Sequence, residues 1–433
     1  MNRPLNVIVI GAGICGLSAA IWLRRAGHTV TLIDREGPGA GASFGSAGLL
    51  AQWAVVPVNT PDLPLTALKY LANPRSPFFL QWSALPQLAP WLVEFVGNSR
   101  PARVRHMVSA IAGIVTDSVE QHRALTRGTR AERWIASSAL SYAYASRRAF
   151  QADRLGWELK RREGFEPEII EGRAVQEAEP MLSPAIGLLA VLRGHGHILD
   201  PGAYMADLAR VLEDEGGRVL RAEARDIDLD GGRVRAVLTG EGRLECDRLV
   251  LAAGIWSRPL MEKLGLSVPL VAERGYHLHF SEPSQVPRNP MMITQGRFVA
   301  TPMATGLRCA GTVELGNTVK GPSRAPLRLI ARHVKRLFPQ LRYRGVEEWM
   351  GFRPSTPDSL PLIGEIAGTG VHAAFGHQHV GLTAGPRTGR IVAALIDGKP
   401  PNLDLAPYDA NRFTSGKARL GRRPRQPAPT PQS

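Results

Sequence analysis

The stretch that most constrains the fold is the glycine-rich turn Gly11-Ala12-Gly13-Ile14-Cys15-Gly16. A β-branched apolar run, residues 7–10, precedes this turn, and apolar residues at helical spacing follow it as far as Gly27. A second apolar run, residues 28–33, ends at Asp34, which lies 18 residues after the last glycine of the turn. Strand, turn, helix, strand and carboxylate at this spacing predict one βαβ nucleotide-binding unit.

Each glycine of the turn has a separate expected role. Gly11 permits a tight turn, Gly13 lets a pyrophosphate approach the backbone, and Gly16 lets the helix pack closely on the strand. The positive end of the helix dipole would face the phosphates, and Asp34 would accept hydrogen bonds from ribose hydroxyls. The alternative is a structural turn without a ligand, and the motif by itself does not distinguish NAD from FAD.

The loop after Asp34 indicates which dinucleotide is bound. Residues 35–48 are rich in Gly, Ala and Ser, at a place where a nicotinamide enzyme usually begins its next helix. Such small residues imply a backbone pressed against a ligand. With this loop, the chain resembles the FAD-dependent oxidoreductases of the D-amino-acid oxidase (DAO) superfamily, specifically the D-amino-acid dehydrogenase branch, over roughly residues 5–412.

A second motif, in residues 349–364, is more specific than the glycines. This motif resembles the Gly-x-Arg-Pro…Asp-x-x-Pro-x-Ile-Gly signature of that family. It consists of Gly351-Phe352-Arg353-Pro354 and, after a short gap, Asp358-Ser359-Leu360-Pro361-Leu362-Ile363-Gly364. The resemblance implies that Arg353 binds the substrate carboxylate, for which a planar guanidinium offers bidentate pairing. The alternative is that Arg353 pairs with Asp358 and only holds its own loop, in which case Arg274 is the next candidate anchor.

The resemblance also implies the remaining site residues. The expected FAD contacts are Gly11, Gly13, Ile14, Cys15, Gly16, Asp34, Arg35, Ser43, Gly48, Leu49, Ala224, Ala253, Gly254, Val380, Gly381, Leu382 and Thr383. The candidate substrate contacts are Arg353, Arg274, Tyr276 and Phe298, and the candidate catalytic residues are Arg353, Tyr276 and His379. Ordinary sheet packing is an equal alternative for the two aromatics, and backbone roles are favoured around His379. No metal site is predicted, because the paired His195 and His197 have no accompanying Cys or carboxylate cluster.

The predicted fold class is α/β, a discontinuous Rossmann-like FAD-binding domain joined to an α+β substrate domain on an antiparallel sheet. The expected FAD-binding segments are 1–60, 170–265 and 345–411, and the substrate-domain segments are 61–169 and 266–344. Residues 57–105 predict short helices or hairpin arms rather than strands, and further helices are expected at 105–127, 146–163, 326–338 and 387–396. Residues 412–433, basic and proline-rich with no acid, predict a flexible tail.

Composition limits the partners. The net charge of +15 favours anionic surfaces, but no basic stretch is interleaved with aromatics, so nucleic acid is not expected. Contact with an anionic membrane stays open, with the apolar residues 78–95 packing either on the protein or on a membrane. Three cysteines far apart indicate no disulfide framework. The first strand follows Met1 almost directly and no apolar run spans a bilayer, so we expect a cytoplasmic protein, with peripheral attachment to the inner membrane face as an option.

The expected activity is FAD-dependent oxidative deamination of a small amino acid, first a D-amino acid and among these a D-proline derivative. Hydride would pass from Cα to flavin N5, giving an imine and then a 2-oxo acid and ammonia. A quinone or another carrier is favoured over oxygen as the electron acceptor. Two alternatives stay open: a 2-hydroxy-acid dehydrogenase with His379 as base, and a flavin-bearing subunit of a larger electron-transfer complex.

Overall fold

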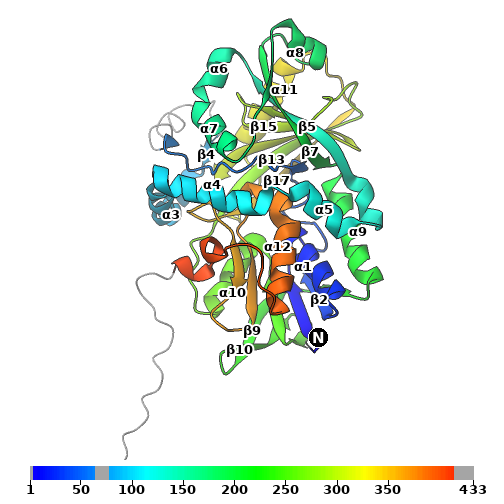
Figure 1. The fold of residues 1–433 in the computed structure, drawn as a ribbon, viewed down its shortest axis with the longest axis vertical. Coiled ribbons are helices and arrows are strands. Elements are labelled where there is room, and N and C mark those ends of the chain that lie inside the picture. The colour runs from blue at the N-terminus through cyan, green and yellow to red at the C-terminus, as the bar shows by residue number, and fades with distance from the viewer. Residues whose placement is uncertain (1–2, 64–77, 414–433) are drawn as a thin grey trace, which may run out of the picture.

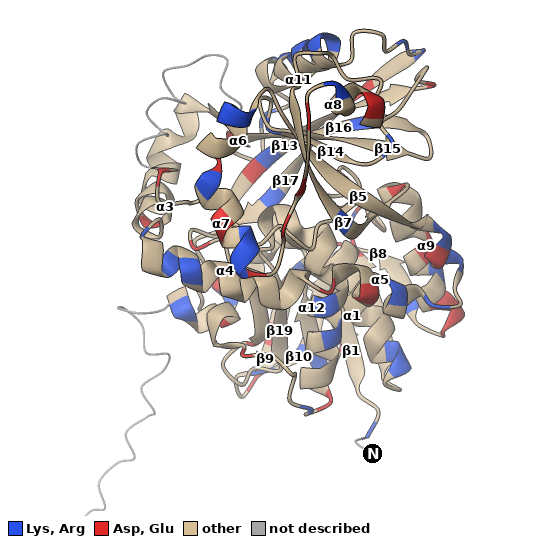
Figure 2. Cartoon of the chain, turned by 45° about the horizontal axis from the view of Figure 1, so that its top comes forward, with Lys and Arg blue, Asp and Glu red and all other residues tan. Residues whose placement is uncertain are grey.

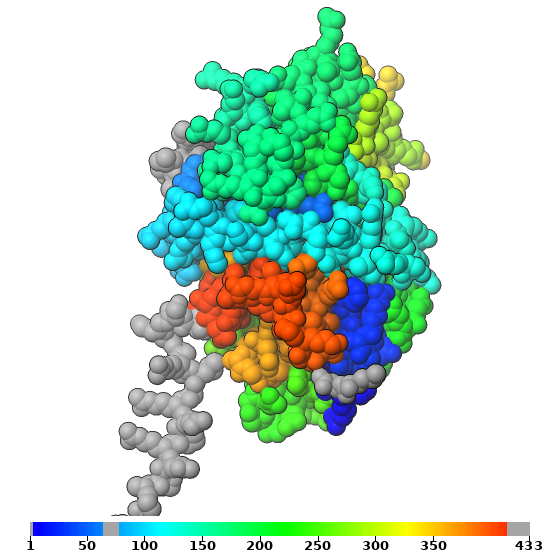
Figure 3. Space-filling view, in the orientation of Figure 1, coloured from blue at the N-terminus to red at the C-terminus, as the bar shows by residue number. Residues whose placement is uncertain are grey.

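The computed structural model describes residues 3–63 and 78–413. A six-stranded, mostly parallel sheet and its helices form the lower half of the view in Figure 1, and a large, mostly antiparallel sheet forms the upper half. Helices α3 (Leu85–Gly97), α4 (Pro101–Val115) and α5 (Ser118–Thr126) cross the molecule between these halves. In the space-filling view of Figure 3 this segment is the cyan band that covers the junction.

The parallel sheet contains the βαβ unit that the glycine turn predicts. Its strand order is β18-β19-β12-β1-β2-β8, and only β18 runs antiparallel to its neighbour. The strands are β1 (Asn6–Ile10), β2 (Thr29–Asp34), β8 (Arg218–Arg221), β12 (Arg248–Leu251), β18 (Leu362–Glu365) and β19 (Val371–Phe375). The Rossmann-like prediction is confirmed, since β1, α1 (Ile14–Arg25) and β2 follow one another as expected.

Helix α12 (Gly381–Ile396) packs against α1 through small residues. A side chain at Gly385 would lie 2.7 Å from the side chain of Ile14, and one at Gly389 would lie 2.5 Å from the backbone nitrogen of Ala19. These glycines therefore let the two helix axes approach closely. The helix begins six residues before the expected 387, because Pro386 lies inside it rather than at its start.

The second sheet has ten strands and supplies most of the upper half. Its path is β17-β13-β16-β15-β14-β5-β7-β3, with β4 paired to β16 and β6 paired to β7. The strands are β3 (Leu49–Leu50), β4 (Phe78–Leu80), β5 (Ile135–Tyr144), β6 (Glu168–Glu171), β7 (Leu188–Ile198), β13 (Val271–Ser281), β14 (Met291–Ile293), β15 (Phe298–Met303), β16 (Gly306–Leu315) and β17 (Gly345–Ser355). Most pairs are antiparallel, as expected, and β14–β5 and β16–β4 are parallel.

Several expected boundaries differ from the observed elements. Strands β7 and β17 belong to the large sheet, although segments 170–265 and 345–411 were assigned to the FAD-binding domain. Strand β7 joins this sheet because it pairs with β5, and β17 joins it because it pairs with β13. These partners are distant in the sequence, so a local sequence pattern does not show the pairing. Strand β4 also contradicts the expectation of no strands in residues 57–105. The exact division into two domains remains a prediction.

The expected helices at 105–127 and 146–163 are each divided in two. The first is α4 and α5, and the second is α6 (Arg147–Ala152) and α7 (Arg154–Arg162), which meet at Asp153. The other helices are α8 (Arg173–Ala178), α9 (Pro201–Asp214), α10 (Ser257–Lys263) and α11 (Arg324–Leu337). Asp200-Pro201 is a helix start signal in the sequence, and Asp200 caps α9 by accepting hydrogen bonds from two backbone N–H groups.

A small meander and the end of the described chain complete the fold. Strands β9 (Ala224–Asp230), β10 (Arg233–Thr239) and β11 (Gly242–Glu245) form the meander. The sequence predicts a hairpin with arms at 219–229 and 233–238, and the structure divides its first arm between β8 and β9. Arg412 and Phe413, the first two residues of the predicted tail, belong to the ordered turn Ala410–Phe413, and Arg412 forms an ion pair with Asp358 at 2.6 Å. Residues 414–433 of the predicted tail lie outside the described residues. No helix in the described part of the chain is both long and apolar enough to cross a membrane.

Candidate active site

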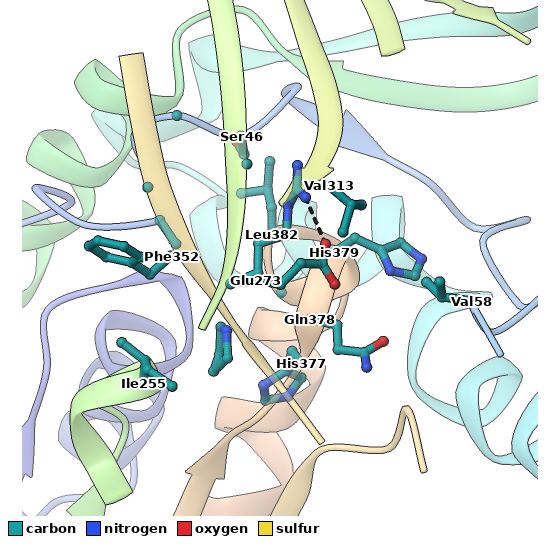
Figure 4. A pocket seen from close by; sticks show the side chains of 18 of the residues that line it. Ser46, Val58, Ile255, Glu273, Val313, Phe352, His377, Gln378, His379 and Leu382 are labelled. Atoms are coloured by element: carbon teal, nitrogen blue, oxygen red, sulfur yellow. Dashed lines mark hydrogen bonds and ion pairs between the residues drawn. The ribbon is translucent and has the colours of Figure 1, made fainter. Parts of the chain in front are cut away.

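A cavity of about 1550 Å³ lies between the two large sheets. Its walls include the turns after β1 and β12, the end of β2 and its following loop, and residues of β5, β13, β16 and β17. The close-up in Figure 4 shows side chains from these separate elements converging on one space. The cavity is therefore built by the junction of the parallel and antiparallel layers, where open α/β sheets place their ligand sites.

The glycine turn forms one wall of the cavity. Gly11 has φ of +103°, and a side chain there would lie 2.6 Å from the carbonyl oxygen of Ala252. Gly13 lines the cavity and is the extended N-cap of α1, with no side-chain cap and no acidic residue in the first helical turn. Gly16 faces away from the cavity, and its α-carbon packs against the Gly11 carbonyl, where a side chain would stand only 1.8 Å away. The uncapped helix end suits an anionic group.

Asp34 lines the cavity and also organises the adjoining loops. Its Oδ2 accepts a hydrogen bond from the backbone N–H of Ala12, and its Oδ1 accepts from those of Glu36 and Gly37, at 2.9–3.0 Å. A carboxylate has about four acceptor positions, so its oxygens still have capacity for ribose hydroxyls. This geometry is compatible with the expected role of Asp34 as an acceptor for ribose hydroxyls. It also gives Asp34 a structural role, because the same carboxylate holds the backbone of two loops.

Most of the other expected cofactor residues meet in the same cavity. The lining includes Gly11, Gly13, Ile14, Cys15, Asp34, Arg35, Ser43, Gly48, Leu49, Ala224, Ala253, Gly254, Gly381, Leu382 and Thr383. Val380 is buried beside the cavity without lining it, like Gly16. Ser43 accepts a hydrogen bond from the N–H of Ile14 at 3.1 Å, which ties the small-residue loop to the start of α1. Residues separated by more than 300 positions therefore form one continuous surface.

Arg353 lies in the cavity wall and is held from one side. Its Nη1 donates to Glu273 Oε1 at 2.7 Å and to the Thr312 carbonyl at 3.1 Å, while the buried Glu273 also accepts from Ser355 Oγ. The dashed line in Figure 4 ends on Glu273 at the centre of the pocket. Among the described residues, no hydrogen bond engages Nε or Nη2 of Arg353, so that edge remains for a planar anion.

The protein partner of Arg353 is not Asp358, the residue named in the alternative interpretation. Asp358 pairs with Arg412 instead, at 2.6 Å. Glu273 was missed by the sequence analysis, although it lies directly opposite Arg353 in the β13–β17 pairing. Gly275, two residues further along β13, leaves room for the guanidinium, since a side chain there would lie 2.5 Å from Arg353 Cζ.

Arg274 and Tyr276 do not line the cavity, which corrects their predicted role as substrate contacts. Both side chains are buried on the opposite face of β13, where Arg274 Nη1 donates to Glu314 at 2.6 Å and the Tyr276 hydroxyl donates to the same carboxylate. Successive side chains of a strand point to opposite faces, so Glu273 and Gly275 take the cavity side. Phe298, the third expected contact, does line the cavity.

His379 lines the cavity at the start of α12. Its side chain is exposed to this space, and the protein around it reduces its solvation and so lowers its pKa, with Glu273 opposing the shift and Arg353 adding to it. The histidine is therefore neutral at pH 7. His377 is buried below it (Figure 4), with Nε2 at 2.9 Å from Thr388 Oγ1, and it serves the packing of this turn.

One cationic group of the cavity wall, Lys160 of α7, was not found from the sequence. The run of basic residues at 146–163 predicts a solvated face, but Lys160 is buried and lines the cavity with Arg297, Tyr142 and Trp53. Burial lowers its pKa to about 8. Helical spacing in α7 places Lys160 three residues after Trp157 on the buried side, and this was the available signal.

These features are those of a dinucleotide enzyme, and the comparison with protein families decides which one. The model of the DAO family, described as FAD dependent oxidoreductase, matches residues 6–395. The chain belongs to the DAO family of FAD-dependent oxidoreductases. The predicted family and enzyme class are confirmed, and FAD is the cofactor of this DAO-family enzyme.

Individual relatives cover nearly the whole DAO-family chain. The D-amino-acid oxidase of Bradyrhizobium diazoefficiens is 36% identical over 95% of this chain and 100% of its own length. The D-amino acid dehydrogenase of Paramagnetospirillum magneticum is 29% identical over 95% of this chain and 99% of its own. The solved glycine oxidase of Geobacillus kaustophilus has the same fold, with a TM-score of 0.72 at 22% identity over 95% of this chain and 99% of its own.

The cavity of this DAO-family enzyme fits FAD in shape and chemistry. The N-terminus of α1, which has no acidic residue in its first turn, and the absence of a side chain at Gly13 suit a pyrophosphate. Gly48, another residue of the lining, has φ of +74°, and a side chain there would lie 2.8 Å from the Ile198 carbonyl oxygen, so this position requires glycine. The N-terminus of α12, at Gly381 to Thr383, directs a second helix dipole at the same cavity, where it would favour negative charge.

Proposed function

We propose that this enzyme oxidises the Cα–N bond of a D-amino acid to an imine, which water converts to a 2-oxo acid and ammonia. The names of the relatives, D-amino-acid oxidase and D-amino acid dehydrogenase, support the substrate class. The observation that carries the proposal is the Arg353 guanidinium, whose hydrogen bonds to the described residues all come from Nη1, so that its other edge is left for a ligand in a cavity with largely apolar walls. That edge suits the α-carboxylate of an amino acid.

We assign the substrate-handling roles as follows. Arg353 binds the α-carboxylate and orients Cα, and Glu273 positions Arg353. His379, neutral at pH 7, accepts a proton from the substrate ammonium, so that the nitrogen lone pair can form the C=N bond as hydride leaves Cα. FAD, when bound, supplies the hydride acceptor.

The cofactor contacts are proposed from the lining of the cavity. Gly13 and the start of α1 would hold the pyrophosphate, and Asp34 and Ala224 would contact the adenosine. Gly48 and Leu49 would contact the flavin ring, and the N-terminus of α12 would lie at the end of the ring where negative charge develops on reduction.

Anaerobic flavin bleaching tests the proposed reaction. We expect D-amino acids, with D-proline in the panel, to bleach the flavin absorbance, and the L-enantiomers and 2-hydroxy acids to leave it unchanged. Admission of air or of a quinone to the reduced enzyme then identifies the acceptor, for which we propose a quinone or similar carrier. Bleaching by 2-hydroxy acids alone would contradict the proposed reaction and support the alternative, a 2-hydroxy-acid dehydrogenase. Bleaching by no compound would contradict catalysis on both amino acids and 2-hydroxy acids.

We further propose that α3 contacts an anionic membrane that carries the acceptor. Trp82 is 65% exposed, Val93 73% and Val96 41%, and Trp82 and Val96 also line the cavity. Figure 2 shows Lys and Arg on the neighbouring α4. An apolar rim with basic neighbours suits an anionic lipid surface. Wild-type enzyme should sediment with anionic vesicles at low salt but not at high salt, and the Val93→Asp variant should sediment less. Equal sedimentation of the wild type with anionic and neutral vesicles would contradict the proposed membrane contact.

A further inference from the structure

Lys160 is an unusual side chain to find in the cavity wall. It is 5% exposed, and its Nζ lies 4.8 Å from the ring centre of Trp157, 5.1 Å from that of Tyr142 and 5.9 Å from that of Trp53. Within residues 3–63 and 78–413, neither a hydrogen bond nor an ion pair satisfies this ammonium group. Buried charges are normally paired, so a buried lysine that lines a cavity without an acid partner points to an anionic ligand.

The surrounding charges leave this region positive. Arg297 also lines the cavity, and its charge acts on Lys160 closely enough to lower the lysine pKa further. The facing acid is Asp153, which accepts a hydrogen bond from the Tyr144 hydroxyl at 2.6 Å and makes no ion pair in the described structure. Two cations therefore face one carboxylate here. Arg353 and Arg274, in contrast, each have a buried glutamate as partner.

We propose that Lys160 and Arg297 form a subsite that binds a second carboxylate, carried on the side chain of the substrate. The enzyme would then prefer acidic D-amino acids, with the α-carboxylate on Arg353 and the side-chain carboxylate on Lys160 and Arg297. This inference rests on the proposed function and specifies its substrate class.

The geometry brings the two anchors to one space. The Thr312 carbonyl accepts from Arg353 Nη1 at 3.1 Å, and the Thr312 N–H donates to the Arg297 carbonyl at 3.2 Å. One residue of β16 thus links the two arginines, and both of them line the same cavity. Lys160 approaches from α7, on the side of the cavity formed by Tyr142 of β5. A short dicarboxylate has the right chemistry to span two such cationic groups.

The first experiment compares D-aspartate and D-glutamate with D-asparagine and D-glutamine, which have the same shape without the second charge. The wild-type holoenzyme should show kcat/KM on the order of 10- to 100-fold higher for the acids, the range of one or two charged hydrogen bonds. Lys160→Met should remove most of this preference and change the amides less than about threefold. Lys160→Arg should retain it. Equal kcat/KM for acids and amides in the wild type would overturn the proposal.

A binding experiment separates this proposal from the proposed reaction. Succinate and propionate, neither of which has an amino group to oxidise, are titrated into the oxidised holoenzyme while the flavin spectrum is followed. Succinate should bind at least 10-fold tighter than propionate, and this advantage should fall as pH rises through about 8, where Lys160 loses its proton. In Lys160→Arg the advantage should persist above that pH. Equal affinities would overturn the subsite even if D-alanine is oxidised, whereas a succinate advantage without turnover of any amino acid would contradict only the proposed reaction.

Discussion

Replacing Arg353 by leucine should affect activity and stability through different partners. The substitution removes the proposed carboxylate anchor while keeping an apolar side chain of moderate size. Two charged hydrogen bonds of about 1.5–3 kcal/mol each would be lost with the substrate. With tenfold per 1.4 kcal/mol, kcat/KM should fall about 10²- to 10³-fold or more.

The same change leaves Glu273 without its cation. Glu273 is 7% exposed, and its remaining side-chain partner among the described residues is the Ser355 hydroxyl. Protonating an ordinary glutamate at pH 7 costs about 3.7 kcal/mol, which bounds the penalty for leaving the carboxyl unpaired. Water can reach the space left by Arg353, which is itself 22% exposed, so we expect a loss of about 1–3 kcal/mol in the free energy of unfolding.

A double variant separates the two effects. Arg353→Leu combined with Glu273→Gln removes the unpaired charge and should recover most of the stability in chemical denaturation, but not the kcat/KM. Arg274→Met is the matched control, because Arg274 pairs with a buried glutamate on the far face of β13. It should destabilise the fold while the remaining folded enzyme keeps its KM. Recovery of activity in the double variant, or an unchanged KM in Arg353→Leu, would refute the anchor role.

Four further outcomes follow from the described contacts. Gly13→Val should give a protein that purifies without flavin absorbance, since its side chain would enter the pyrophosphate surface near Ser43. Asp34→Ala should weaken FAD binding and also lower the melting temperature, because three backbone N–H groups lose their acceptor. Gly389→Ala should destabilise the holoenzyme by about 1–3 kcal/mol, measured by denaturation, because the added methyl group meets the backbone of α1. The free energy of unfolding should fall as pH decreases below about 6.5, because burial lowers the pKa of several histidines in the folded state, so that the unfolded state binds more protons. Each such histidine should contribute up to roughly 1.4 kcal/mol per pH unit, and denaturation at several pH values measures the sum. The histidines with this shift include His122, His195 and His372, with pKa about 4, and His277 and His377, with pKa about 3.

The features that could be predicted from the sequence are those set by local pattern. The glycine turn, the following helix and the carboxylate at Asp34 need only near neighbours in the chain. Alternation of apolar and polar residues within 276–312 likewise predicts the antiparallel strands of the second sheet. Alternation assigns residues to two faces but does not tell which face meets the cavity. A shift of one residue reverses the assignment, and this is why Tyr276 was predicted in place of Glu273.

Charge patterns misled for a similar reason. Helix α7 carries three Arg, one Lys and one Glu along a short segment, and the basic side of such a helix is ordinarily solvated. Lys160 falls on the opposite, buried side because Trp157 and Leu159 pack inward next to it. Its environment is made by Trp53 and Tyr142, which are distant in sequence, so only the assembled structure shows that it faces the cavity.

The position of the cavity wall at α12 depends on residues that do not line the cavity. Pro386 has no N–H to bond the carbonyl of Leu382, four residues earlier, and that carbonyl lies 2.9 Å from His122 Nε2. A carbonyl can only accept, so Nε2 carries the proton and Nδ1 accepts from the Tyr204 hydroxyl at 2.8 Å. Burial lowers the pKa of His122 to about 4, which keeps the imidazole in the neutral form that this arrangement requires. Helices α5, α9 and α12 are thereby joined at one buried histidine, and the start of α12 is fixed at the cavity by a residue outside it.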